Sequence, residues 1–293
     1  MNPLPLKARD QACQNENTHR QFAHRIGRAA VGSLYAELAL SPKPGLVSPL
    51  DNGAHRDMTM ATFMRSLFAL RGYFREIALA GINNASFATL KALGIEAERR
   101  MLKSTGGINT HRGAIFNLGL LVAATGFRKA RNMHLRAESL CETVAALWGA
   151  DIIQSAPEAV SSNGLIALGR YGGLGARDHA AAGFPVIRLH ALPALRTAIN
   201  DGFCQREARV QTLFSIMAVL DDTNLLHRGG QAGLDFVRCK SKAFLAAGGV
   251  RSDNWQMDAL DLHAACVRRH LSPGGAADLL AAAIFLHDME TRQ

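Results

Sequence analysis

The sequence is poor in aromatic residues and has no long apolar run. Aromatic side chains make up 6% of the 293 residues, which argues against a stacking platform for single-stranded nucleic acid. No apolar run approaches the roughly 20 residues that a membrane-spanning helix needs. The first 18 residues are polar and include Asp10 and Glu16, so they lack the apolar segment of a secretory signal. These absences argue against membrane insertion, secretion and single-strand binding.

The cysteines lack the pairing that disulfides or zinc would require. Cys13, Cys141, Cys204, Cys239 and Cys266 are odd in number and widely spaced. No two form a C-x-x-C pair, and none has a zinc-binding spacing with histidine. Reduced thiols and a cytoplasmic location fit this pattern best.

The signatures of common nucleotide-binding and hydrolytic enzymes are also missing. The chain has no G-x-x-x-x-G-K-[ST] phosphate loop, no G-x-G-x-x-G turn, no H-E-x-x-H motif and no complete H-R-D-L-x-x-x-N kinase loop. The usual NTPase, dehydrogenase, zinc-hydrolase and kinase interpretations therefore lose support.

Positive charge is concentrated in the first half of the chain. Residues 1–150 hold 19 Lys/Arg against 10 Asp/Glu, whereas residues 151–293 hold 14 against 14. This bias favours a polyanionic partner but does not separate nucleic acid from a nucleotide polyphosphate.

Apolar residues recur with helical spacing along most of the chain, and strand-like alternation is missing. Phe22, Ile26 and Ala30 are four residues apart, and their helix should end before Pro42. Residues 113–125 are apolar nearly all round, which predicts a buried central helix. Further helices are expected from Phe63, after a Ser86 cap, and over residues 132–149, 158–170, 189–199, 204–220, 231–247, 253–269 and 275–290. We therefore predict an all-α fold, with one compact domain of about ten helices over residues 19–293 and a disordered tail over residues 1–18.

Two loops in the first third of the chain are candidate sites. Pro42 and Pro44 hold Lys43 in extended backbone, which presents its ammonium at a fixed place; a solvated loop lysine is the simpler alternative. One turn upstream, Glu37 could face the same side or lie on the surface. Charged residues then cluster in a polar turn at His55, Arg56 and Asp57, although Asp57 or Thr59 could instead cap the next helix.

A glycine-rich turn precedes the predicted central helix. Gly106 and Gly107 are followed by Asn109, Thr110, His111 and Arg112. Thr110 could cap the helix, while His111 and Arg112 would place cations at a helix start, where anions are preferred. A bound phosphate would explain this arrangement, and a tolerated surface arginine is the alternative.

Two carboxylates follow the helix predicted over residues 204–220. Asp221 and Asp222 precede Asn224, and oxygen ligands of this kind suit Mg²⁺ held together with substrate phosphates. Capping of the next helix is the alternative.

Glycines also open the last predicted helix. Gly274 and Gly275 could expose N–H groups to a phosphate. The carboxylate of Asp278 lies in the first turn of this helix, where the helix dipole favours an anion, so its presence there needs no catalytic role.

Taken in order, these segments resemble the triphosphoribosyl-dephospho-CoA synthase family, over roughly residues 25–290. The motifs that coincide are S-P-K-P-G-L-V, H-R-D-M, G-I-N-T-H-R-G-A-I-F, D-D-T-N and S-P-G-G-A-A-D-L-L. Departures include Arg112 where lysine is usual and His179 where we expect a glutamate nearby, a role that Asp178 could take. The resemblance implies a helical enzyme that converts ATP and 3′-dephospho-CoA to 2′-(5″-triphosphoribosyl)-3′-dephospho-CoA and adenine. It also implies that the product passes to a transferase acting on an acyl-carrier protein of malonate decarboxylase or citrate lyase, and the S-P-L-D-N-G segment favours the malonate branch.

The resemblance also implies roles for individual residues. The reaction should pass through an oxocarbenium-like transition state, with a carboxylate as base or charge stabiliser. The predicted catalytic residues are Asp57, Asp222 and Lys43, and the predicted Mg²⁺ ligands are Asp221, Asp222 and Asn224. The predicted substrate-binding residues are Glu37, His55, Arg56, Asn109, Thr110, His111, Arg112, Arg177, Arg228, Gly274 and Gly275. Two alternatives stay open: an ATP-dependent phospho- or nucleotidyltransferase, and a noncatalytic basic helical module that binds RNA or an acidic protein.

Overall fold

The computed structural model describes residues 6–155 and 163–291, and this part of the chain is helical without strands. The α-helices are α1 (Leu6–Leu38), α2 (Met60–Ile82), α3 (Phe87–Thr105), α4 (Arg112–Ala130), α5 (Ala137–Gln154), α6 (Asn163–Tyr171), α7 (Ala176–Ala181), α8 (Leu192–Asn200), α9 (Gln205–Met217), α10 (Thr223–Ala246), α11 (Trp255–Arg268) and α12 (Gly274–Thr291). A π-helical turn (Ile187–Ala191) precedes α8, and a short 3₁₀ turn (Gly249–Arg251) precedes α11. The all-α prediction is confirmed. No helix among the described residues is long and apolar enough to cross a membrane.

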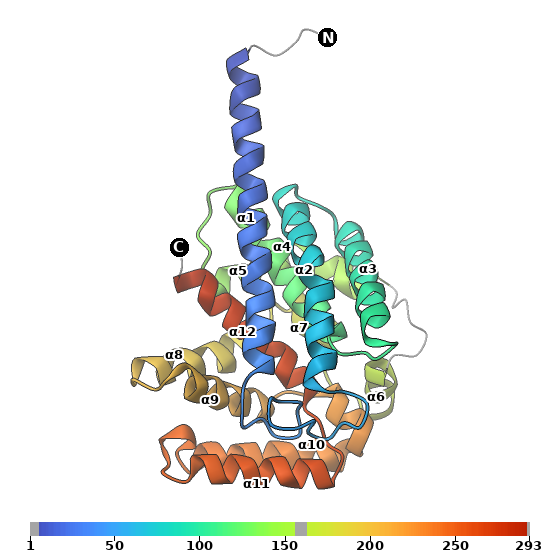
Figure 1. Ribbon diagram of the computed structural model, residues 1–293, viewed down its shortest axis with the longest axis vertical. Coiled ribbons are helices and arrows are strands. Elements are labelled where there is room, and N and C mark those ends of the chain that lie inside the picture. Colours follow the sequence, from blue (N-terminus) through green and yellow to red (C-terminus); the bar gives the residue numbers. More distant parts are fainter. Residues whose placement is uncertain (1–5, 156–162, 292–293) are drawn as a thin grey trace.

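The central helix α4 organises the core. Its residues from Leu118 to Gly126 are all buried, as the apolar run predicted. It packs against α2 at close range, because a Cβ at Gly81 would lie 1.9 Å from the carbonyl oxygen of Ala123. Figure 1 shows α12 crossing the middle of the molecule beside α4 and α1, while α10 and α11 lie at one end.

Several boundaries differ from the sequence predictions. Residues 6–18 belong to α1, which begins at Leu6, where we expected a disordered tail; this segment contains no proline or glycine to interrupt the helix. Residues 1–5 lie outside the described part. Figure 1 shows this end of α1 projecting from the body. The helix expected over residues 132–149 is shifted to Ala137–Gln154. Part of the helix expected over residues 158–170 lies outside the described residues.

Two further differences concern α7 and α10. The six residues of α7 were missed, since so short a helix carries no measurable apolar period. Helix α10 starts at Thr223 instead of residue 231, and it is kinked at Gly230, where φ is 61°. Glycine tolerates this backbone conformation at little cost, so Gly230 allows a kink within α10.

Helix caps settle two of the open alternatives. The Ser86 hydroxyl accepts a hydrogen bond from the N–H of Thr89, as predicted for the start of α3. Thr59 caps α2 by accepting from the N–H of Thr62 at 3.2 Å. Asp57 is therefore not used as a cap.

Candidate active site

A cavity of about 1660 Å³ lies where the first turns of α4, α10 and α12 meet the loop between α1 and α2. All but one of the predicted site residues line it. Arg56 is the exception, since it lines a small neighbouring pocket with Asp57, Arg228 and His270. Segments more than 200 residues apart in the sequence thus share one site. The lining residues predicted from the sequence are Glu37, Lys43, His55, Asp57, Asn109, Thr110, His111, Arg112, Arg177, Asp221, Asp222, Asn224, Arg228, Gly274 and Gly275.

Lys43 and Glu37 form a buried ion pair at the cavity wall. The Lys43 Nζ atom lies 2.7 Å from Glu37 Oε1 and 2.9 Å from the Glu37 carbonyl oxygen. Only 2% of Lys43 is exposed, which excludes the solvated-lysine alternative. Burial lowers the pKa of Lys43, while Glu37 opposes that shift. Charge neutralisation by Glu37 makes Lys43 a weaker phosphate clamp than its isolated position in the sequence suggested.

His111 is buried and neutral, so its predicted role as a cation at the start of α4 is wrong. Its Nδ1 atom lies 2.7 Å from Ser66 Oγ, and its ring meets Phe63 edge-on. Burial, and secondarily the charge of Lys43, lower the pKa of His111 to about 3. The Nε2 atom is buried without a hydrogen-bond partner among the described residues. An unpaired buried nitrogen on a cavity wall is available to a ligand.

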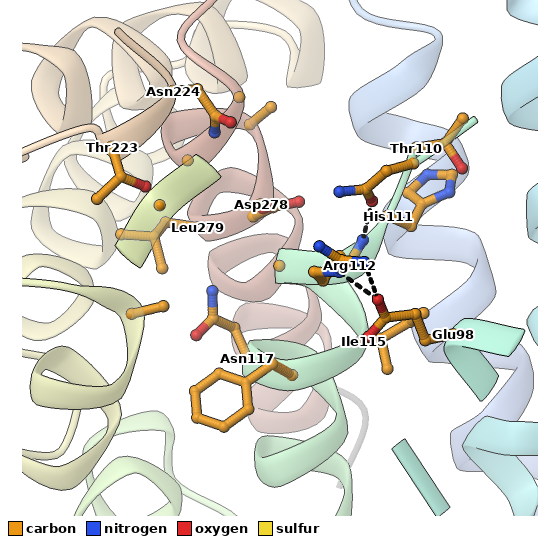
Figure 2. Close-up of a pocket in the computed structure, with 18 of the residues that line it drawn as sticks. Glu98, Thr110, His111, Arg112, Ile115, Asn117, Thr223, Asn224, Asp278 and Leu279 are labelled. Carbon is orange, nitrogen blue, oxygen red and sulfur yellow. Dashed lines mark hydrogen bonds and ion pairs between the residues drawn. The ribbon is translucent and has the colours of Figure 1, made fainter. Parts of the chain in front are cut away.

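The rest of the glycine-rich turn also departs from the prediction. Thr110 does not cap α4; the N-cap position is His111, without a side-chain bond, and the Thr110 hydroxyl is buried and unpaired. The Asn109 side chain accepts from the N–H of Arg112 at 3.2 Å. The guanidinium of Arg112 is ion-paired with Glu98 (Figure 2), so its charge is shared before any ligand arrives.

Asp222 joins the first turns of α10 and α12. Its Oδ1 atom accepts from the N–H groups of Asn224 and Leu225, and Oδ2 accepts from the N–H of Ala276 at 2.9 Å. The capping alternative is therefore confirmed, and the carboxylate also binds α12. Burial raises the pKa of Asp222, while these N–H donors oppose the shift because they favour the anion.

The predicted magnesium ligands do not converge. Asp221 pairs with Arg238 at 2.7 Å and also accepts from the N–H of Leu174, so all four carboxylate oxygens of the Asp pair already have donors. Asn224 packs beside Gly274, where an added Cβ would lie 2.8 Å from its Nδ2 atom. Among the described residues, no group of three or more His, Cys, Asp or Glu side chains could hold a metal ion. These residues do not fit a cation site built by the protein alone.

The sequence interpretation underrated Asp278. This residue lines the cavity one turn into α12, and a Cβ at Gly113 would lie 2.0 Å from its Oδ2 atom. Glycine is therefore required at the start of α4 for Asp278 to fit. Burial raises the pKa of Asp278 well above its ordinary value, and the charges of Glu37 and Asp222 add to this shift. Its position at a helix start supplied a dipole explanation and hid this environment.

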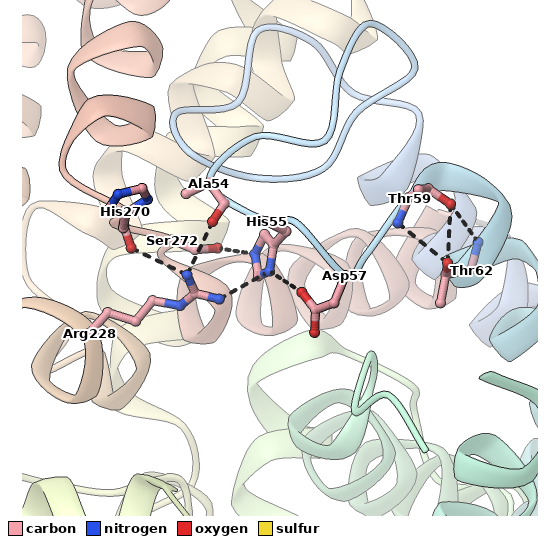
Figure 3. Close-up of polar contacts among 8 residues, drawn as sticks. All are labelled: Ala54, His55, Asp57, Thr59, Thr62, Arg228, His270 and Ser272. Carbon is pink, nitrogen blue, oxygen red and sulfur yellow. Dashed lines mark hydrogen bonds and ion pairs between the residues drawn. The ribbon is translucent and has the colours of Figure 1, made fainter. Parts of the chain in front are cut away.

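His55 and Arg228 form a polar cluster at the cavity edge (Figure 3). Arg228 can only donate, and its Nη2 atom lies 3.0 Å from His55 Nδ1, so the ring proton must be on Nε2, which lies 2.8 Å from Ser272 Oγ. Burial, followed by the charge of Arg228, lowers the pKa of His55 to about 4. His55 is thus a neutral positioning group for Arg228. Asp57 lies beside it, 4.0 Å from Nδ1, with 62% of its side chain exposed.

The guanidinium of Arg177 binds main-chain groups at the cavity wall and stabilises the end of a helix. Its guanidinium donates to the main-chain carbonyls of Ile152, Ile153 and Ser155 at the C-terminal end of α5. Cations at this end of a helix are favoured by the dipole. Asp178 accepts from the N–H of Gly175 at 2.8 Å and begins α7, which commits it to a local cap.

Two buried polar residues of the cavity were missed. Asn117 on α4 is 4% exposed and His179 on α7 is 7% exposed. Within the described part of the chain, Oδ1 of Asn117 and both ring nitrogens of His179 have no hydrogen-bond partner. Burial lowers the pKa of His179, although the nearby charges of Asp221 and Asp178 oppose this shift. His179 therefore does not supply the charged group that we expected from a glutamate in this segment. Asn117 lies within the apolar run that marked the core helix, and its position along the helix was the only available signal.

Comparisons with known proteins identify the family. A family model described as ATP:dephospho-CoA triphosphoribosyl transferase matches residues 23–293. A protein of Acinetobacter calcoaceticus named probable 2-(5″-triphosphoribosyl)-3′-dephosphocoenzyme-A synthase is 38% identical over 92% of each chain. The synthases of Pectobacterium atrosepticum and Klebsiella pneumoniae are 40% and 37% identical, over 91% and 90% of this chain and 89% and 90% of theirs. No solved structure matches the chain. The chain therefore belongs to the ATP:dephospho-CoA triphosphoribosyl transferase family.

Proposed function

We propose that this protein transfers the 5-triphosphoribosyl group of ATP to the 2′-hydroxyl of 3′-dephospho-CoA, with release of adenine. The observation that carries the proposal is a single cavity that holds two carboxyl groups in different environments: Asp222 accepts from three backbone N–H groups, and Asp278 lies near two other carboxylates. Pockets for one small molecule typically occupy about 300–1000 Å³. The cavity, at about 1660 Å³, has room for two nucleotides together.

The reaction exchanges one bond at the anomeric carbon of the ATP ribose. The bond from C1″ to N9 of adenine breaks, and a bond from C1″ to the acceptor O2′ forms. The hydroxyl proton must go to a base, and adenine must gain a proton because its anion is a poor leaving group. Positive charge develops on the ribose between these events, as in glycoside hydrolysis.

Asp222 and Asp278 have environments suited to these opposite tasks. Three backbone N–H groups donate to Asp222 and favour its anion against the effect of burial, which suits a base or a stabiliser of the ribose cation. Asp278 has a raised pKa, next to Glu37 and Asp222, which suits the acid that protonates adenine. Carboxyl groups whose environments separate their pKa values divide acid and base roles in other enzymes.

The triphosphate is proposed to lie toward the exposed side of the cavity. Arg228 provides a cation there that, among the described residues, is bound only to neutral groups, His55 and two main-chain carbonyls. Arg112 provides a second cation, which its ion pair with Glu98 already holds in part. Magnesium enters the proposal only as the counter-ion that accompanies the triphosphate.

Further aspects of the proposal rest on the sequence and on the resemblance. They are the malonate branch, a downstream transferase that acts on an acyl-carrier protein, a cytoplasmic location and the lack of nucleic-acid binding. None of these follows from the cavity. Asp57 remains a predicted base, although its exposed carboxylate makes it a weaker candidate than Asp222.

Product analysis tests the proposal directly. Purified protein is incubated with ATP, Mg²⁺ and 3′-dephospho-CoA, and the products are identified by mass spectrometry. Free adenine in equal amount to a triphosphoribosyl adduct of dephospho-CoA is expected. Release of ADP, AMP or pyrophosphate would instead support the phospho- or nucleotidyltransferase alternative. Absence of turnover together with steeply salt-dependent RNA binding would support the binding module.

A further inference from the structure

Asn117 presents a free carboxamide to the interior of the cavity. The residue is 4% exposed, lines the cavity, and its Oδ1 atom has no hydrogen-bond partner among the described residues. A buried amide oxygen left unpaired costs about 1–3 kcal/mol. Such a group on a cavity wall therefore indicates a polar ligand atom that completes it.

The carboxamide differs from the other unpaired groups of the cavity. The hydroxyl of Thr110 and Nε2 of His111 are single atoms, and the two unpaired ring nitrogens of His179 point in diverging directions from the ring. An amide places a donor and an acceptor side by side, and this pair matches the N7 acceptor and the N6 amino donor of adenine. A base ring also needs apolar contacts, and Phe116, Leu168 and Leu279 line the same cavity.

The position of Asn117 along α4 relates it to Asp278. Gly113 contacts Asp278, and Asn117 follows four residues later, on the same face of the helix and about 6 Å along its axis. This separation is comparable to the length of a purine. Figure 2 shows Asn117 on the side of the cavity that carries Leu279 and Thr223, away from Glu98 and Thr110.

We propose that Asn117 recognises the adenine that leaves, by pairing its carboxamide with the N6 and N7 atoms of ATP beside the carboxyl group of Asp278. This inference rests on the proposed function and names its specificity determinant. Dephospho-CoA also contains adenine, so the same pairing chemistry has two sources. We assign the ATP base because Asn117 lies on the face of α4 that Asp278 of α12 contacts at Gly113.

The test compares ATP with purine riboside triphosphate, which lacks the N6 amino group, and measures release of the free base by chromatography. The wild-type protein should prefer ATP by about 5- to 150-fold in kcat/KM. In Asn117→Ala this preference should fall towards one, because the remaining pocket does not contact N6. The exposed Asn254, which starts α11 without a side-chain cap bond, supplies the control Asn254→Ala, which should keep the wild-type preference.

A second arm separates the two sources of adenine. The same variants are assayed with ATP and a dephospho-CoA analogue that carries purine in place of adenine. If Asn117→Ala loses the preference for dephospho-CoA over its purine analogue but keeps the preference for ATP, the adenine of dephospho-CoA occupies the site. The assignment to the ATP base is then overturned. The inference is also overturned if Asn117→Ala keeps the full preference for ATP.

A third arm needs no variant, in case Asn117→Ala does not fold. Free adenine should inhibit the wild-type protein more strongly than purine by a similar factor, and equal inhibition would contradict recognition of N6. Failure of the wild-type protein to release adenine from ATP would overturn the proposed function itself, which is a different outcome from all of these.

Discussion

Two groups of ionisable residues line the same cavity and have opposite physical character. The buried group consists of Glu37, Lys43, His111 and Asp222, none more than 6% exposed, and Asp278 interacts with it. The exposed group consists of Asp57, Arg112 and Glu98, whose side chains are 62%, 40% and 28% exposed. Desolvation shifts the pKa values of Lys43, His111 and Asp222 in the buried group, whereas solvent screens charges in the exposed group. The comparison indicates that burial within the cavity, more than residue type, identifies the groups with shifted pKa values, and these are the groups to which we assign roles in the proposed reaction.

The largest expected effect concerns Asp278. The change Asp278→Asn keeps the shape next to Gly113 but removes the proton that adenine needs, so kcat should fall about 10²- to 10⁴-fold. Folding should not suffer. Because the pKa of Asp278 is raised on folding, the stability linked to its protonated form is lost as pH rises through that pKa. The variant should therefore gain stability relative to wild type as pH increases.

Measurements of adenine release and of urea unfolding at several pH values check both parts. The matched change Asp258→Asn lies in the first turn of α11, an exposed site outside the cavity, and should leave turnover unchanged. A variant Asp278→Asn with wild-type turnover would remove Asp278 as the acid and would weaken the distinction between the two groups.

The next effect comes from breaking the buried ion pair. In Lys43→Met the carboxylate of Glu37 is left without its cation, and the free energy of unfolding should fall by about 3–5 kcal/mol. Adding Glu37→Gln to this variant should recover part of the loss, since the second change removes the uncompensated charge. Denaturant unfolding of the single and double variants measures this. Equal stability of both would mean that the pair is solvated, unlike the rest of the buried group.

A smaller effect is expected from His111 at acid pH. Its pKa falls from an ordinary 6.5 to about 3 on folding, so its contribution to stability is present above pH 6.5 and is lost as pH falls toward 3. Each pKa unit corresponds to about 1.4 kcal/mol. In His111→Asn, whose amide can still reach Ser66, the loss of stability between pH 6.5 and 4 should be shallower than in wild type. If the free energies of unfolding of His111→Asn and of wild type decrease equally between pH 6.5 and 4, the pKa of His111 is not lowered by burial.

The smallest effects are expected in the exposed group. Breaking the ion pair of Arg112 through Glu98→Gln should change the free energy of unfolding by about 0.2–1 kcal/mol, because exposed pairs are screened. The KM for ATP should fall slightly, since Arg112 is then free to bind phosphate. Thermal unfolding and steady-state kinetics provide the measurements. A loss of several kcal/mol would place this pair with the buried group.

Asp57→Asn sharpens the same comparison. Its exposed carboxylate predicts little change in turnover or stability, compared with the large loss expected for Asp278→Asn. Adenine release measured side by side decides between them. A loss of 100-fold or more at Asp57 would restore it as the base and would mean that the bound substrates, not the protein alone, desolvate this side of the cavity.

The amino-acid sequence by itself determined the helical fold, the buried central helix, the family and the segments that form the cavity. Apolar periodicity and short motifs report these features because they depend on neighbours a few residues apart. Only the tertiary structure decided which groups are charged. Asp222 accepts from Ala276, which is 54 residues away, and Asp278 is influenced by Glu37 at the other end of the chain. The desolvation of a side chain, and a buried group without a hydrogen-bond partner such as Oδ1 of Asn117, both result from packing between distant elements. Local sequence patterns therefore cannot predict them.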